Sequence, residues 1–381
     1  MATSVFLEDT LRDLTPYIGT DADLPAFFGA PRAPSAQVAT PVTISVSIGP
    51  EPRQFPANGC TFRNQSARWM WLLRNSKRKQ RAPSTLVTFE SGLRTIFKNL
   101  DPDTRLAEFT NASMRDFIAR ISAPRIVANG SEMRRKQLKA ASVQQLGLIL
   151  RLVIASARDG NGDRLFNPQW DSEFIDIPKI GKQKQPTLTR EQIETLCKAP
   201  GQYGMIFAFL AGTGLRVSEM QAVRISGNNS QSTWTPAESV VIVRNACFRN
   251  KETGRTKTES GRRRVLVCSE LNRALIAFVD QAKREDGDFL FRSKEGPVRL
   301  STLRDRLSKI IPGTSPHAFR RWRNSHLIAS RVLGGIVKAQ MGHSKSQDMS
   351  ELYNFQDETT VCREQIEAAG LGFQIGDNSN A

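Results

Sequence analysis

Residues 315–355 read SPHAFRRWRNSHLIASRVLGGIVKAQMGHSKSQDMSELYNF, and this stretch decides most of what we expect of the chain. It holds every histidine of the protein and one of its three tyrosines: His317, His326, His343 and Tyr353. Functional side chains of three kinds are therefore concentrated in about a tenth of the sequence. The alternative interpretation is a basic helix whose histidines only pack in the core.

The spacing in this stretch predicts a series of short helices. Ser315 followed by Pro316 is typical of a helix start, in which the serine side chain caps the helix and proline stands in the first turn. His317 and Arg320 then share one face, because helical residues three apart are neighbours. A second helix is expected to end at Gly342, which places His343 at its exit.

Tyr353 closes the stretch on a third helical piece, SQDMSELY. An imidazole beside a guanidinium, a second imidazole and a nearby phenol are suited to cleaving a phosphodiester with a tyrosine nucleophile. We interpret His326 as structural, because no motif includes it.

The composition indicates a polyanionic partner. The 381 residues carry a formal net charge of +17 and a pI near 10.1, so nucleic acid is the first candidate and an acidic membrane surface the second. No apolar run is long enough for a membrane span, and no signal peptide pattern is present. Five cysteines without paired spacing indicate reduced thiols and no zinc site. We expect a cytoplasmic protein, associated with a bacterial nucleoid, that needs no metal and no cofactor.

The positive charge lies outside the first 60 residues, which hold three arginines against six acids. We expect residues 1–60 to form an acidic extension that is mostly extended or disordered. Apolar residues spaced by three and four then predict helices around 66–76, 86–100, 114–121 and 143–153, joined in part by a basic connection, EMRRKQLK. Residues 61–177 are thus expected to form an all-helical domain, and residues 178–188 a linker.

The second half of the chain changes to a mixed pattern. Thr189 and Gln192 form a capping box, and GMIFAFLAG predicts a buried helix that ends near Gly214, a glycine that turns the chain and aims Arg216. The runs SVVIVRNACF and RRRVLVC predict strands around a loop with Lys257 near its tip. The expected fold class is mainly α with a small antiparallel β-sheet (α+β).

The end of the chain is expected to carry one more short helix. We place this domain at residues 189–356 and a C-terminal helix and tail at 357–381. Cys362, Ile366 and Ala369 fall on one stripe of that helix, which Gly370 ends. The residues from Leu371 onward are expected to fray.

Five elements in order resemble the motifs of the tyrosine recombinase (phage integrase) family: TGLRVSE (213–219), TKT (256–258), PHAFRR (316–321), MGHS (341–344) and the tyrosine at 353. The resemblance covers about residues 61–370, and five ordered elements are far more specific than any one of them. It implies an all-helical core-binding domain followed by a catalytic domain, which together form a C-shaped DNA clamp.

The resemblance also implies the catalytic residues, namely Arg216, Lys257, His317, Arg320, His343 and Tyr353, with Glu219 as the acid that supports Arg216. Lys251 is a second candidate for the hairpin lysine. Tyr353 lies ten residues past His343, one more than the family pattern leads us to expect. The chain also has PHAFRRWRNSH where the family usually has small and apolar residues after the second arginine.

The chemistry explains these residue types. Two arginines can hold the non-bridging oxygens of a phosphodiester with planar forks. Tyr353 attacks the phosphorus and is left joined to DNA by a 3′-phosphotyrosyl bond. His317 is the candidate base, and His343 the candidate hydrogen-bond donor to the phosphate. Lys257 would protonate the leaving 5′ oxygen. The bond energy is conserved in the covalent link, so the step needs neither ATP nor a metal.

We expect a wider group of basic residues to contact DNA: Arg74, Lys77, Arg78, Lys79, Arg81, Arg134, Arg135, Lys136, Arg255, Arg262 and Arg263. The implied partner is double-stranded DNA with specific sites, bound by a dimer on one site and a homo-tetramer on paired sites. Accessory DNA-bending or directionality proteins are further candidates. The C-terminal helix could dock on its own protomer or in trans on a neighbour.

Integration or excision of a mobile element is the first hypothesis, on the ground of the long N-terminal extension. The alternatives are a chromosome or plasmid dimer resolvase and a type IB topoisomerase-like enzyme, which would relax supercoils without joining two sites. A rival of another class is a DNA-binding regulator on a recombinase scaffold, which would form no covalent adduct. A nonspecific RNA-binding protein is disfavoured, since no aromatic RNA-binding signature is present.

Overall fold

The computed structural model describes residues 60–76, 81–129, 132–181, 187–249, 251–253, 261–343 and 360–376. Its contacts divide the chain into two compact units, Met1–Gln183 and Lys184–Ala381. The division falls within the stretch 178–188, where the sequence predicts a linker. The N-terminal extension, Lys257 and Tyr353 lie outside the described residues. Each unit is considered by itself.

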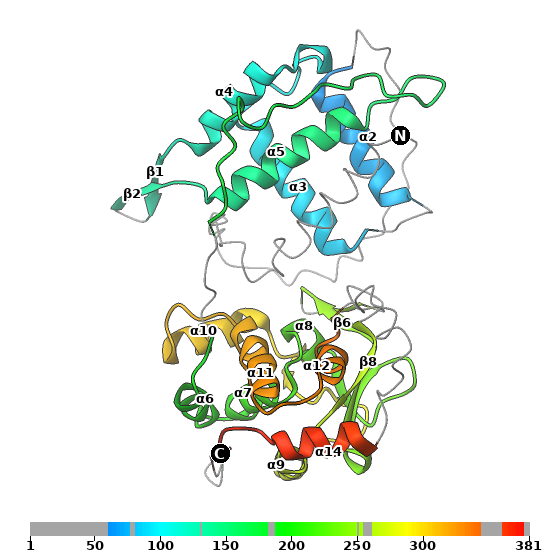
Figure 1. The fold of residues 1–381 in the computed structure, drawn as a ribbon, viewed down its shortest axis with the longest axis vertical. Helices are drawn as coiled ribbons and strands as arrows, with labels where there is room; N and C mark the ends of the chain where they lie inside the picture. Colours follow the sequence, from blue (N-terminus) through cyan, green and yellow to red (C-terminus); the bar gives the residue numbers. More distant parts are fainter. Residues whose placement is uncertain are drawn as a thin grey trace. The chain divides into compact units, whose positions relative to one another are not determined.

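The first unit is built on four helices, which confirm the four predicted from apolar spacing: α2 (Phe62–Asn75), α3 (Pro83–Phe97), α4 (Asn111–Ser122) and α5 (Ala140–Ala155) (Figure 1). Helix α5 contacts each of the other three and buries seven of its residues. A Cβ built on Gly92 of α3 would lie 2.3 Å from Ile149 Cδ1, so the glycine allows α3 and α5 to approach closely. A short 3-10 helix, η2 (Leu106–Glu108), precedes α4.

A β-hairpin replaces part of the connection predicted between the third and fourth helices. Strands β1 (Arg125–Asn129) and β2 (Glu132–Lys136) pair antiparallel, with Arg125 opposite Lys136 (Figure 1). The sequence analysis expects a basic connection at 132–136 without predicting its strand. The β-branched residues Ile126 and Val127 favour the extended conformation. Strand pairing then gives the backbone N–H and C=O groups of the facing strand their hydrogen-bond partners.

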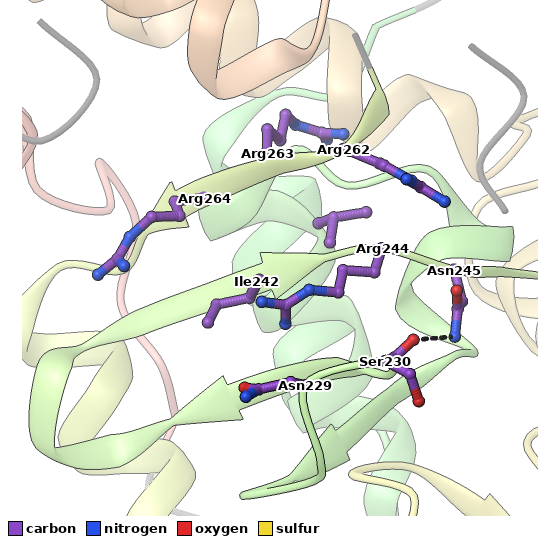
Figure 2. Close-up of a pocket in the computed structure, with 9 residues that line it drawn as sticks. Asn229, Ser230, Ile242, Arg244, Asn245, Arg262, Arg263 and Arg264 are labelled. Carbon is purple, nitrogen blue, oxygen red and sulfur yellow. Dashed lines mark hydrogen bonds between the residues drawn. The ribbon is translucent and has the colours of Figure 1, made fainter. Parts of the chain in front are cut away.

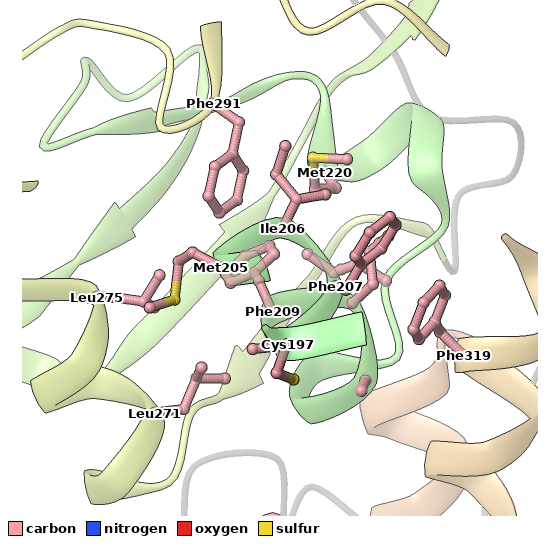
Figure 3. Close-up of a cluster of buried hydrophobic side chains, with 14 of the residues drawn as sticks. Cys197, Met205, Ile206, Phe207, Phe209, Met220, Leu271, Leu275, Phe291 and Phe319 are labelled. Carbon is pink, nitrogen blue, oxygen red and sulfur yellow. The ribbon is translucent and has the colours of Figure 1, made fainter. Parts of the chain in front are cut away.

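The second unit is organised around α7 (Gln202–Thr213), in which every residue from Gly204 to Thr213 is buried. A helix that is apolar on all sides must be covered on all sides. Figure 3 shows its phenylalanines meeting other elements: Phe207 stacks on Phe319 with ring centroids 5.5 Å apart, and Phe209 meets the edge of Phe291 at 5.4 Å. The predicted buried helix is therefore confirmed.

The other helices of this unit lie around α7: α6 (Arg190–Cys197), α8 (Val217–Met220), α9 (Ser269–Gln281), α10 (Leu300–Ile310), α11 (His317–Ala329), α12 (Gly334–Met341) and α14 (Thr360–Ala369). The capping box predicted at the start of α6 is present, with the Gln192 amide N–H donating to Thr189 Oγ1 at 3.3 Å. The cap predicted for α11 at Ser315 is wrong, because Pro316 itself occupies the cap position.

A four-stranded sheet flanks the helices, in the order β3 (Val223–Ile225), β4 (Ser232–Thr235), β5 (Val240–Val243) and β8 (Arg263–Leu266). Strands β5 and β8 correspond to the predicted pair. The sheet is mixed rather than purely antiparallel, since β3 and β4 pair parallel. Ser226, at φ 44°, turns the chain between these two strands. Two short hairpins complete the unit: β6 (Ala246–Phe248) with β7 (Lys251–Thr253), and β9 (Arg292–Ser293) with β10 (Gly296–Pro297).

Helix α14 packs on its own domain. Cys362 and Ile366 are buried in a cluster with Val240, Leu266 and residues of α12. The Ser269 amide and hydroxyl donate to the Glu367 carboxylate at 3.0 and 2.9 Å. Docking of this helix on a neighbouring protomer stays a prediction.

Residues 371–376, the described part of the segment predicted to fray, pack on the domain, contrary to that prediction. Leu371 and Phe373 are buried in the main core, and Phe373 meets the Trp322 ring at 5.4 Å. Arg323 Nη1 donates to the Gly370 carbonyl at 2.6 Å, and His326 Nε2 lies 2.9 Å from the Ala369 carbonyl oxygen. His326 therefore has the structural role predicted for it.

We expect Phe373→Ala to lower the free energy of unfolding of the second unit by about 3 kcal/mol, because it removes a buried aromatic side chain and leaves a cavity. Chemical denaturation measures the loss. Gln374→Ala is the matched control, since this neighbouring side chain is exposed. Equal stability of the two variants would show that the tail does not pack on its own domain.

Candidate functional site

The turn after α7 presents Arg216. Gly214 ends α7 in the left-handed conformation, with φ 66°, and Arg216 caps α8 two residues later. The Arg216 amide donates to Glu219 Oε2 at 3.0 Å, and Arg216 Nη1 donates to Glu219 Oε1 at 2.7 Å. The Arg216 side chain is 22% exposed, whereas the Glu219 side chain is 3% exposed. Arg216 is thus held by a buried acid at the surface of the domain.

Arg320 approaches the same place from α11. Its Nη1 donates to the Gly214 carbonyl at 3.0 Å, and its Nη2 donates to the Met341 carbonyl. These carbonyls belong to the C-terminal ends of α7 and α12, where backbone acceptors lack intrahelical partners. Burial, followed by repulsion from Arg216, lowers the pKa of Arg320 to about 9. The guanidinium therefore stays charged at neutral pH.

Arg263 completes the ion network around Glu219. Its Nη2 donates to Glu219 Oε2 at 3.0 Å, and its own side chain is only 7% exposed. Burial by itself would raise the pKa of Glu219, but Arg263 and Arg216 outweigh it and lower that pKa to about 2. The predicted contact of Arg263 with DNA stays a prediction, and the observed partners of its guanidinium all belong to the protein.

Two of the predicted catalytic histidines, His317 and His343, are among the described residues. His317 is the first residue of α11, one turn before Arg320, and is exposed. His343 follows Gly342, which ends α12 in the predicted left-handed conformation. Burial, then the charges of Arg320, Arg216 and other nearby cations, lower the pKa of His343, which favours its neutral imidazole.

The structure thus brings together Arg216, Glu219, Arg320 and His343, from segments more than a hundred residues apart in sequence. Lys257 and Tyr353 lie outside the described residues. The contact that sequence reasoning missed is the ion pair of Arg263 with Glu219. Its signal was present, because Arg263, Val265 and Val267 alternate, and this alternation turns Arg263 toward the buried side of the strand.

The other predicted DNA contacts are spread over both units. Arg74 pairs with Glu90 at 2.5 Å on α2 and α3, and Arg81 and Lys136 are partly buried. Arg134 and Arg135 belong to β2. Arg262 is exposed and lines an open pocket of about 490 Å³ on the sheet, together with Arg244 and Asn245 (Figure 2). Lys77, Arg78, Lys79 and Arg255 lie outside the described residues.

Among the described residues, no helix is long and apolar enough to cross a membrane. No group of three or more His, Cys, Asp or Glu side chains in these parts of the chain could hold a metal ion.

Comparisons with known proteins identify the fold. No protein-family model and no curated protein matches the chain. A Tn1549 transposon integrase in complex with transposon right end DNA aligns with a TM-score of 0.56 and 18% identity, over 81% of this chain and 98% of that one. A lambda integrase tetramer bound to a Holliday junction aligns with a TM-score of 0.50 and 13% identity, over 79% and 80%. This chain shares the fold of these integrases, which agrees with the fold predicted from the sequence.

The low pKa of Glu219 predicts a pH-dependent stability. A carboxylate whose pKa is lowered by folding stabilises the protein above its unfolded pKa, and this contribution is lost as pH falls toward the folded pKa. Folding lowers the pKa of Glu219 from its usual 4.5 to about 2. This shift adds on the order of 3 kcal/mol to the free energy of unfolding at pH 6. Chemical denaturation of wild type and Glu219→Gln should show a stability difference that shrinks by roughly half by pH 3. A difference independent of pH would contradict the assigned ion network.

Proposed function

We propose that this protein is a site-specific DNA recombinase that cleaves and rejoins DNA through a 3′-phosphotyrosyl intermediate on Tyr353. The observation that carries the proposal is the convergence of Arg216 and Arg320 beside a buried carboxylate and a neutral imidazole. The fold shared with integrases supports the class of enzyme.

The charge of the cluster fits a phosphodiester. Arg216, Arg263 and Arg320 carry three positive charges against the single negative charge of Glu219, which leaves an excess of two. A phosphodiester carries one negative charge, and attack by an oxygen adds about one more in the five-coordinate state. The cluster therefore neutralises the transition state better than the ground state, and this difference is what accelerates a reaction.

Cleavage replaces one bond to phosphorus by another and transfers two protons. His317 accepts the phenol proton while the Tyr353 oxygen bonds to phosphorus, and the bond from phosphorus to the 5′ oxygen breaks. Lys257 gives a proton to the departing 5′ oxygen. A 5′ hydroxyl from a second strand reverses these steps, because the phosphotyrosyl link retains the bond energy. Neutral His343 donates a hydrogen bond to the phosphate.

The rest of the chain would serve binding and assembly. Residues 61–177 act as the core-binding domain, residues 178–188 as the linker and residues 189–356 as the catalytic domain of a DNA clamp. The partner is double-stranded DNA with specific sites, on which four protomers assemble. Integration or excision of a mobile element is the proposed role, in a bacterial cytoplasm.

A nicked suicide substrate tests the mechanism. The DNA comes from sequence flanking the gene or from a selected pool, and EDTA is present throughout. Wild type should give a denaturant-resistant protein–DNA band, and Tyr353→Phe should give none, since it lacks the attacking oxygen. Tyr203→Phe is the matched control, because this tyrosine packs against the core of the domain.

The alternatives give different results. Specific binding without a band from any variant would establish a DNA-binding regulator and remove the catalytic assignments. A band on the nicked substrate, together with relaxation of an intact supercoiled plasmid but without joining of two sites, would indicate a topoisomerase-like enzyme.

A further inference from the structure

Arg263 has the most fully engaged guanidinium of the cluster. It stands first in β8, next to the segment that carries Lys257. Its Nη1 and Nη2 donate to the two oxygens of Glu219 at 3.3 and 3.0 Å. Its Nε donates to the Gln340 carbonyl at 2.9 Å, and Nη1 also donates to the Gly261 carbonyl at 3.0 Å. All three nitrogens therefore serve the protein, which argues against a direct contact with substrate.

The Glu219 carboxylate accepts hydrogen bonds from two arginines. Oε1 accepts from Nη1 of Arg216 and of Arg263, and Oε2 accepts from the Arg216 amide and from Arg263 Nη2. This pattern fixes the plane of the carboxylate. Because a guanidinium is planar and rigid, fixing Arg216 Nη1 on that carboxylate also fixes the direction of its other donors. Arg263 thus acts on Arg216 through Glu219.

Arg263 also supports the exit of α12. Besides its bond to the Gln340 carbonyl, it packs under Gly342, where an added Cβ would lie 2.9 Å from Arg263 Nη1. Gly342 has φ 60°, so the chain turns directly over the guanidinium before reaching His343. One side chain therefore contacts Glu219 of α8, the Gly261 carbonyl just before β8 and the turn at Gly342 that leads to His343.

We propose that Arg263 is a positioning residue, which holds Glu219 and the exit of α12 so that Arg216 and His343 face one phosphate. This inference rests on the proposed function, since the phosphate is that of the cleaved DNA. Arg263 itself does not touch the DNA.

The test separates rate from binding. Arg263→Gln should slow single-turnover adduct formation on the nicked substrate about 100-fold, the effect expected of a misplaced reacting group. DNA affinity and its salt dependence should stay within about twofold, because no phosphate contact is lost. Arg264→Gln is the matched control and should react at the wild-type rate. Arg264 is the next residue, is 37% exposed and pairs with Glu238, and Figure 2 shows it leaving β8 on a different side.

Two results would overturn the proposal. An unchanged rate in Arg263→Gln would show that the residue positions nothing. A weaker affinity with a smaller salt dependence would show that Arg263 contacts a DNA phosphate after all. If Arg263→Gln fails to fold, Arg263→Lys replaces it, since lysine keeps the charge but lacks the planar fork; slow adduct formation with normal affinity is again the expected result.

A double-mutant cycle tests the route through Glu219. Glu219→Gln and Arg263→Gln combined should slow the reaction no more than the slower single variant, and multiplied effects would contradict the shared route. If wild type forms no adduct on any DNA, the proposed function fails. The same double-mutant cycle can then be measured by thermal unfolding. If the stability losses of the two single variants add up in the double variant, Arg263 and Glu219 are not coupled and the inference is wrong.

Discussion

The buried carboxylate of Glu219 is the constraint on which the candidate site depends. Two guanidinium groups neutralise it, and together they hold α8 against β8 and the end of α12. Removing one partner of a buried ion pair leaves a charge without compensation and costs about 3–5 kcal/mol. Replacing a whole buried ionic group by apolar residues is often neutral or even stabilising. The network is therefore better explained by the direction that it gives to the Arg216 guanidinium than by stability alone.

The C-terminal ends of two helices hold Arg320, the second arginine of the candidate site. Arg320 donates to the carbonyls of Gly214 and Met341, which end α7 and α12. The C-terminal end of a helix carries a partial negative charge, so a buried cation is stabilised there without an acidic side chain. This arrangement matters chemically, because a carboxylate beside Arg320 would cancel the charge offered to a phosphate. Left-handed glycines at 214 and 342 let both chains turn away directly after these carbonyls.

Much of this could be predicted from the sequence where the signal is local. Helices with apolar residues at spacings of three and four, the Thr189 capping box and the terminal glycines are each encoded within a few residues. Arg216, Glu219 and Arg320 could be named because they stand in short motifs. The likeness to integrase structures agrees with the fold predicted from these motifs.

The remaining features depend on contacts between distant segments. Strands β3 and β4 have only three and four residues, too few for a period to show, and they form because each pairs with another strand. Leu371 and Phe373 look like a frayed tail until Trp322 and the main core supply their partners. Arg263 looked like one more basic residue of a DNA-binding loop. Two signals were available but unused: the Asn129–Gly130 pair, typical of hairpins, and the alternation of Arg263 with Val265.

We propose that the arginine cluster acts on the negative charge of one phosphate. A neutral methylphosphonate at the cleavage position removes that charge and so tests the proposal. Single-turnover adduct formation by wild type and Arg216→Ala is compared on the phosphodiester and on the methylphosphonate. On the phosphodiester the variant should be slower by about 100-fold or more, as for the loss of one charge-stabilising donor. On the neutral linkage that difference should largely disappear, since little charge is left to stabilise. An equal loss on both substrates would contradict the account and reduce Arg216 to a structural residue.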